Sequence, residues 1–156
     1  QTGDVFYLET GTVHAIGAGV LLAEIQQTSD ITYRIYDFNR KDSQGNPREL
    51  HTEQALDAIN FDVVETYKSY SKNINVSNNI VDSPYFTTNF IPLTEKYSLT
   101  TNNLTFVVLM CVEGSLQLNY DKGSKKLFQG ESILLPAVSN TYDLVGNASI
   151  LEIYIS

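Results

Sequence analysis

Residues 130–153, GESILLPAVSNTYDLVGNASILEI, decide the fold. A glycine and an acidic residue open the stretch, and short apolar runs then alternate with turn residues up to a last run that contains Glu152. Short apolar runs bounded by Gly, Pro, Asn and Ser are typical of β-strands. The stretch therefore predicts three consecutive strands, at residues 132–135, 141–145 and 149–155.

The same pattern extends upstream of this stretch. It predicts five further strands, at residues 86–93, 97–100, 104–112, 115–120 and 125–128. Eight short strands in roughly seventy residues is the count expected for one jelly-roll barrel. Cys111 lies inside the apolar run FVVLMCV and is expected in the barrel core. This region contains no histidine, so we expect the barrel to bind no metal.

The two ends of the chain contain similar sequence patterns, which indicates an internal repeat. Residues 3–25, GDVFYLETGTVHAIGAGVLLAEI, align with residues 130–153 when one gap is allowed. The first forty residues predict strands at 4–8, 13–16, 20–27 and 32–38. We therefore expect an all-β chain. Its expected parts are the closing half of a first barrel at residues 1–50, a short helix and linker at 51–84, and a complete second barrel at 85–156.

Between the barrels, three segments are not strand-like. Residues 41–47, KDSQGNP, form a polar loop with Gly and Pro at turn positions. Residues 49–61, ELHTEQALDAINF, have the apolar spacing of one short amphipathic helix, with His51 near its start in a structural role. Residues 70–84 are polar and Asn-rich, which is typical of a linker.

Composition excludes several classes of partner. The 156 residues carry a net charge of −8, and the ten Lys and Arg residues are scattered. Nucleic acid or an anionic membrane would require a concentrated basic patch, whereas one or two placed arginines can still hold a small anion. A single cysteine excludes an internal disulfide and a cysteine-based zinc site. A cytoplasmic location fits these features best, and no stretch approaches the roughly 20 apolar residues of a membrane span.

The spacing around His14 carries the first functional signal. Gly3, Gly11 and His14 stand at the spacing of the second cupin motif, G-x5-P-x-G-x2-H-x3-N, although Glu9 replaces the proline and Ala18 the asparagine. The turn at Gly11 would fold two strands so that His14 points into the mouth of a barrel.

The chain from residue 3 to residue 59 resembles the C-terminal part of bacterial class I mannose-6-phosphate isomerases. Those enzymes share GTxHAIG, AEIQQxSDxTYRxYDxxR and RELHxxxAL in this order, and all three patterns occur here. The resemblance covers about the first sixty residues closely, whereas the remainder is expected to agree in architecture only, as a second, metal-free cupin.

The resemblance implies a role for each matching residue. His14 would be one zinc ligand, and the other ligands would lie upstream in the family. Arg34 would stand near the reacting carbons, with Glu24 and Asp30 as the carboxylates on the same wall of the site. Arg40 would bind the substrate's phosphate. The implied reaction interconverts mannose 6-phosphate and fructose 6-phosphate by zinc-assisted proton transfer through an enediol.

Each assignment has a simpler alternative. His14 could be an ordinary strand histidine, and Arg34 an exposed residue paired with a carboxylate. Glu24 could serve as base or as a supporting partner, and Asp30 could cap a turn. The whole chain could be a non-catalytic cupin module that binds or senses carbohydrate. With one metal ligand, the fragment 1–156 is expected to be inactive alone and to self-associate through an open sheet edge near its N-terminus.

Overall fold

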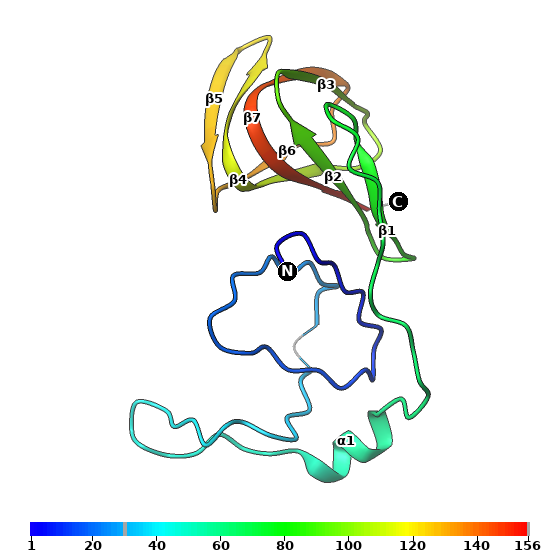
Figure 1. Ribbon diagram of the computed structural model, residues 1–156, viewed down its shortest axis with the longest axis vertical. Coiled ribbons are helices and arrows are strands. Elements are labelled where there is room, and N and C mark those ends of the chain that lie inside the picture. The colour runs from blue at the N-terminus through cyan, green and yellow to red at the C-terminus, as the bar shows by residue number, and fades with distance from the viewer. Residues whose placement is uncertain (30, 156) are drawn as a thin grey trace. The chain divides into compact units, whose positions relative to one another are not determined.

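The computed structural model describes residues 1–29 and 31–155. The chain divides into two compact units, one made of Gln1–Phe6 with Tyr67–Ser156 and the other of Tyr7–Thr66. Every strand of the described chain lies in the first unit, and the helix lies in the second (Figure 1). Asp30, one of the expected site residues, lies outside the described residues.

The first unit is a β-barrel built from one antiparallel sheet. Its order is β1-β2-β7-β4-β5, with β3 also paired to β7 and β6 also paired to β4. The strands are β1 Asn78–Asp82, β2 Thr87–Leu93, β3 Lys96–Thr101, β4 Val107–Tyr120, β5 Gly123–Phe128, β6 Ser132–Leu135 and β7 Asn140–Tyr154. The all-β class and the strands expected after residue 85 are therefore confirmed, except that two predicted pairs are fused into the long strands β4 and β7.

The fusion is possible because β4 and β7 bend instead of ending. Each long strand has one partner along its length and two shorter partners in succession, and Figure 1 shows both strands curving. The bend coincides with a β-bulge between Cys111 and Glu113. Gly114 has a φ of +74°, and a Cβ there would lie 2.3 Å from the Asn147 carbonyl oxygen. Only glycine fits so close to the neighbouring backbone.

The barrel has a continuous hydrophobic core. Inward-facing side chains of the long strands alternate with exposed ones, as the period of a strand requires. Leu109, Cys111, Leu144 and Ile150 are fully buried in this core. The expectation for Cys111 is thus confirmed, and burial raises the pKa of its thiol.

Of the three expectations for residues 41–84, those for the loop and the helix are confirmed and that for the linker is partly wrong. Helix α1 spans Thr52–Ala58 and buries Ala55, and residues 41–47 form a turn-rich loop. The linker expected at residues 70–84 contains β1, which pairs with β2 through an irregular register. The Asn-rich composition predicted a linker and not this strand. In the structure, Asn78 donates to the Phe90 carbonyl oxygen and Asn79 to the Asn89 side chain, so both polar groups have partners within the barrel.

The strands expected in the first forty residues are wrong. Among the described residues, segments 4–8, 13–16, 20–27 and 32–38 hold no strand, and their one bridge joins Phe6 to Tyr67. A strand needs a ladder of hydrogen bonds to a neighbour, and the described residues of these segments make only isolated backbone contacts, such as those around the Phe6–Tyr67 bridge. The open sheet edge expected near the N-terminus is therefore also absent from the described residues.

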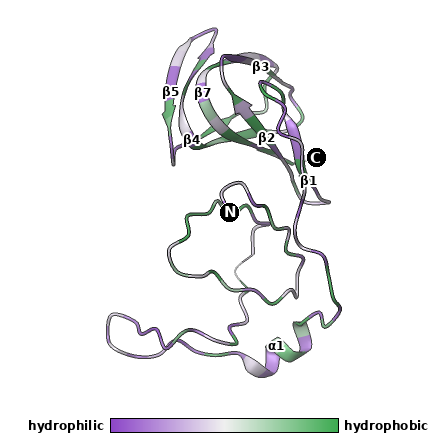
Figure 2. Cartoon of the chain, in the orientation of Figure 1, coloured by the Kyte–Doolittle hydropathy of each residue, from purple (hydrophilic) through white to green (hydrophobic). Residues whose placement is uncertain are grey.

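Apolar runs occur in both units. Figure 2 shows hydrophobic stretches on the barrel strands and also along the trace of Tyr7–Thr66, where the side chains stay exposed. Within the described residues, no helix combines the length and the apolar character needed to cross a bilayer.

Candidate functional site

The loop at residues 41–47 brings two arginines together. Its ends are bridged, and Asp42 both donates a backbone hydrogen bond to Asn46 O (2.8 Å) and accepts one from Asn46 N (2.9 Å) at its carboxylate. This amide contact is the main cause that lowers the pKa of Asp42. The closed loop leaves Arg40 and Arg48, eight residues apart in the sequence, on the same carboxylate.

That carboxylate belongs to Asp37, which is only 6% exposed. Asp37 Oδ1 accepts hydrogen bonds from Arg40 Nε (3.0 Å), Arg40 Nη2 (2.6 Å) and Arg48 Nη2, and Oδ2 accepts one from Arg48 Nε (2.7 Å). The hydrogen bond from Arg48 is the largest of several causes that lower the pKa of Asp37 to about 2. The same contact raises the pKa of Arg48. Asp37 is thus ionised at any physiological pH.

Arg34 lies at the edge of this cluster, and hydrogen bonds of its side chain and of its backbone hold it in place. Its Nε lies 3.9 Å from Asp37 Oδ1, and its Nη1 donates to the Glu49 carbonyl oxygen at 3.1 Å. Arg34 N donates to His51 Nδ1 (3.1 Å), and His51 N donates to the Arg34 carbonyl (2.7 Å). His51 is the N-cap residue of α1, so its predicted place at the helix start is confirmed.

The structure therefore brings together two of the five predicted site residues. Arg34 and Arg40 meet at Asp37. Glu24 is exposed and makes no hydrogen bond or ion pair with any side chain among the described residues. His14 is also exposed, and its ring contacts the Thr12 carbonyl oxygen.

His14 can serve as one metal ligand, but the described residues do not form a complete metal site around it. Its Nδ1 lies 2.9 Å from the Thr12 carbonyl oxygen, which can only accept, so Nδ1 is the donor and Nε2 is the nitrogen left to bind a metal in the neutral ring. No three His, Cys, Asp or Glu side chains that could hold a metal lie together in residues 1–29 and 31–155. A catalytic zinc site needs at least three protein ligands, so the described residues do not fit one.

Sequence reasoning missed Asp37 and Arg48. Asp37 stands in the family pattern AEIQQxSDxTYRxYDxxR and Arg48 in RELHxxxAL, but the resemblance implied no role for either residue. A usable signal was present in the two arginines that flank the Gly-Pro loop at residues 41–47, because such a loop returns the chain to its starting point.

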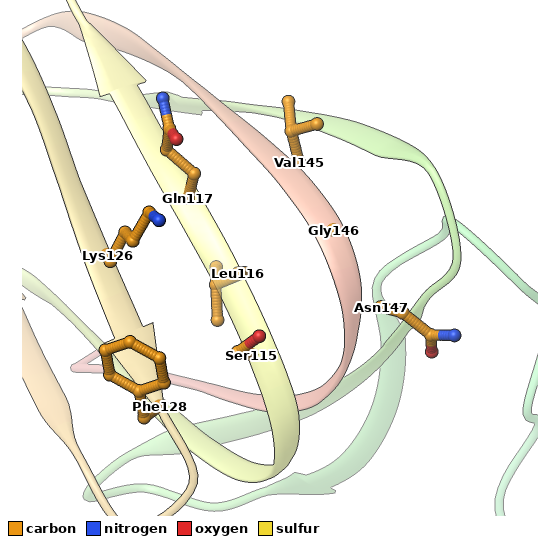
Figure 3. Close-up of a pocket in the computed structure, with 8 residues that line it drawn as sticks. All are labelled: Ser115, Leu116, Gln117, Lys126, Phe128, Val145, Gly146 and Asn147. Carbon is orange, nitrogen blue, oxygen red and sulfur yellow. The ribbon is translucent and has the colours of Figure 1, made fainter.

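The barrel has a shallow surface hollow of about 270 Å³. Figure 3 shows polar Gln117 and Lys126 beside apolar Phe128 and Val145 around it, with Asn147 at the rim. Its lining includes one cation and no carboxylate, so it offers no acid–base pair. The cluster around Asp37 is the stronger candidate site.

Comparison with known proteins identifies the family. Residues 77–155 match the family described as "Mannose-6-phosphate isomerase, cupin domain". The chain belongs to this mannose-6-phosphate isomerase family. The match lies in the barrel, for which the sequence motifs predict agreement in architecture alone.

Individual relatives agree with this assignment. Mannose-6-phosphate isomerase ManA of Bacillus subtilis is 32% identical over 151 residues, which are 95% of this chain and 48% of that protein. Mannose-6-phosphate isomerase of Streptococcus mutans is 56% identical over 59 residues, 38% of this chain and 19% of that protein. The crystal structure of the Bacillus subtilis isomerase superposes with a TM-score of 0.69 and 28% identity, covering 80% of this chain and 40% of that chain. The chain thus spans about half the length of the curated relatives that match nearly all of it.

Proposed function

We propose that this chain is the C-terminal part of a mannose-6-phosphate isomerase that interconverts mannose 6-phosphate and fructose 6-phosphate. The observation that carries the proposal is the joint placement of Arg34 and Arg40 on Asp37, within a chain of this family. The resemblance assigns Arg34 to the reacting carbons and Arg40 to the phosphate of the same substrate.

In this proposal, residues 1–50 form the closing half of a catalytic cupin barrel, residues 51–84 a helix and linker, and residues 85–156 a second, metal-free barrel. Exposed apolar side chains support an incomplete first barrel, since Leu21 is 88% exposed and Ile31 69% exposed. Partner strands from the rest of the isomerase would cover such residues. His14 would supply one zinc ligand through Nε2, with the other ligands coming from outside this chain.

The reaction moves a proton between C1 and C2 through an enediol, so it needs a base, a cation near the developing oxyanion and an anchor for phosphate. The Arg34 guanidinium would stabilise the oxyanion, and its backbone contacts with His51 would fix its position. Glu24 or Asp30 would serve as the base. Arg40 would hold the phosphate.

Fusion to the missing half tests this function. We would join residues 1–156 to the N-terminal half of Bacillus subtilis ManA and follow fructose 6-phosphate production from mannose 6-phosphate. The fusion should turn over substrate, and a chelator should abolish the activity. Arg34→Gln should lower kcat by about a hundredfold or more, as loss of an oxyanion-stabilising group does. Lys126→Met, an exposed change on the barrel, should leave kcat unchanged.

Two results would overturn the proposal. Chelator-sensitive turnover by residues 1–156 alone would show that the metal site is complete without another half. A folded fusion that binds the sugar phosphate without turnover would instead favour a carbohydrate-binding or regulatory cupin module.

Self-association is a further part of the proposal. Two copies could cover the exposed apolar residues of Tyr7–Thr66 for each other, as isolated chains often do with unpaired strand segments. A purely monomeric molecular mass at high concentration in sedimentation equilibrium would count against it.

A further inference from the structure

The cluster around Asp37 carries more positive charge than it cancels. Three guanidinium groups, those of Arg34, Arg40 and Arg48, lie within ion-pair distance of this single carboxylate. Three positive charges against one negative leave a surplus of two. In a protein with a net charge of −8, such a local surplus is a distinct feature.

Nearby acids do not cancel the surplus. The Asp42 carboxylate accepts hydrogen bonds from the amides of its own loop, at 2.8 Å from Gln44 N and 2.9 Å from Asn46 N. The Glu49 carboxylate lies 3.9 Å from His51 Nε2 and makes no ion pair with the arginines among the described residues. Both carboxylates are thus directed at other groups.

Two of the arginines keep donors available for a ligand. Arg40 and Arg48 each donate hydrogen bonds from Nε and Nη2 to the Asp37 carboxylate. Within residues 1–29 and 31–155, neither Nη1 group has a hydrogen-bond partner. Their side chains are 63% and 42% exposed, so a solute can reach these donors. By contrast, Arg34 is 23% exposed and already bonds to a backbone carbonyl.

We propose that Arg40 and Arg48 form a two-arginine receptor for a phosphate dianion, in which Asp37 is the positioning residue that holds both guanidinium groups. Planar guanidinium groups match phosphate oxygens through paired N–H donors. The receptor rests on the proposed function for its natural ligand, a sugar phosphate, and it adds Arg48 and Asp37 to the residues assigned there.

In this proposal, Asp37 favours phosphate binding because it orients the two arginines, not because of its charge. Four hydrogen bonds fix the two guanidinium planes against one buried carboxylate, which removes much of the freedom that an exposed arginine loses on binding. A negative charge beside the receptor by itself opposes phosphate. The two effects of Asp37 therefore have opposite signs, and a substitution can separate them.

The test uses residues 1–156 labelled with 15N at arginine, titrated with inorganic phosphate and read from the Nε–Hε signals. The signals of Arg40 and Arg48 should shift together and saturably. Arg48→Met should weaken binding about tenfold or more, as expected for loss of a charged hydrogen-bonding group. Lys41→Met is the matched control, because it removes the same charge from the same loop without touching Asp37. It should change the affinity less than twofold, roughly the effect of one screened exposed charge.

Asp37→Asn separates positioning from charge. It removes the one negative charge of the cluster, so a purely electrostatic site would bind phosphate more tightly. The receptor predicts weaker binding, because the amide cannot accept four hydrogen bonds from two guanidinium groups. Asp37→Glu should recover part of the affinity. Amide signals of α1 report whether each variant keeps its fold.

Each outcome decides a part of the proposal. Unchanged affinity in Arg48→Met removes Arg48 from the receptor, and tighter binding by a folded Asp37→Asn variant removes the positioning role. No saturable shift in the parent chain overturns the receptor altogether. Because this assay needs no turnover, it can fail while the fusion is an active isomerase, and it can succeed while the fusion is inactive.

Discussion

The barrel and the segment Tyr7–Thr66 are organised by opposite kinds of contact. The barrel buries a continuous cluster of aliphatic side chains between paired strands, with Leu109, Leu144 and Ile150 at its centre. In the segment, Asp37 and Ala55 are the only buried residues among those the structure describes. One unit is therefore held by apolar burial, and the other is centred on a carboxylate that three arginines approach.

The difference teaches that apolar sequence alone does not make a core. Both units contain runs of Val, Leu and Ile, yet those of the segment remain exposed. Burial requires a partner surface, and sheet formation requires a partner edge. In the barrel each long strand supplies both for its neighbours, whereas the described residues of the segment bury only Asp37 and Ala55 and pair only at isolated bridges.

A matched pair of leucine truncations should give the largest contrast between the units. Leu109→Ala removes a fully buried side chain from β4 and should lower the free energy of unfolding by about 2–5 kcal/mol. Leu21→Ala removes an exposed one and should change it by less than about 0.5 kcal/mol. Urea denaturation followed by tyrosine fluorescence measures both. Equal costs would mean that Leu21 is buried in solution, for example by self-association.

A pair of glycine substitutions should give a smaller contrast. Gly114→Ala places a Cβ 2.3 Å from a carbonyl oxygen of β7 and should destabilise the barrel by about 2 kcal/mol or more. Gly45→Ala has a similar positive φ but open space around it, so the cost should be about 1 kcal/mol. Thermal unfolding compares the two variants. If Gly114→Ala were tolerated as well as Gly45→Ala, the close approach at the bend would be wrong.

Acid should loosen the segment before the barrel. The pKa of Asp37 is lowered from 3.8 to about 2 in the folded chain, so its contribution to stability is complete above about pH 4 and is lost as the pH falls through about 2. The Nε–Hε signals of Arg40 and Arg48 should therefore broaden or shift in this window while the amide signals of β4 and β7 persist. In Asp37→Asn this step should be absent. Simultaneous loss of both units would argue against a separately organised segment.

The smallest effect should come from a surface ion pair on the barrel. Lys96 Nζ lies 2.8 Å from Asp143 Oδ2, and this contact is the main cause that lowers the pKa of Asp143. Both groups are solvent-exposed to a large degree, so Lys96→Met should cost no more than about 1 kcal/mol, and less at high salt. A larger cost, unchanged by salt, would show that charge as well as apolar burial holds the barrel.

Local pattern predicted the parts whose partners lie in the described chain. Strands β2 to β7, helix α1 and the loop at residues 41–47 could all be predicted, because period-two apolar runs, helical spacing and Gly-Pro turns act over a few residues. The same rules failed in residues 4–38, where the runs have strand character but the described residues pair at a single bridge, between Phe6 and Tyr67. They also missed β1, in which the Asn79 side chain donates a hydrogen bond to Asn89 of the neighbouring strand β2.

For the candidate site, the motifs predicted Arg34 and Arg40 by resemblance, but they gave no reason for either to be fixed in place. Asp37 and Arg48 supply that reason, and the family patterns contain both residues without assigning either a role. Their importance depends on hydrogen bonds between residues up to 11 positions apart, which form only when the loop closes.

The sequence by itself determined the jelly-roll pattern of the barrel and the family, because alternation of apolar residues and motif order are properties of the chain alone. Only the tertiary structure decided which charges meet. Hydrophobic alternation follows from the fixed two-residue period of a strand, whereas an ion cluster depends on where separate turns of the backbone bring side chains that look unremarkable in sequence.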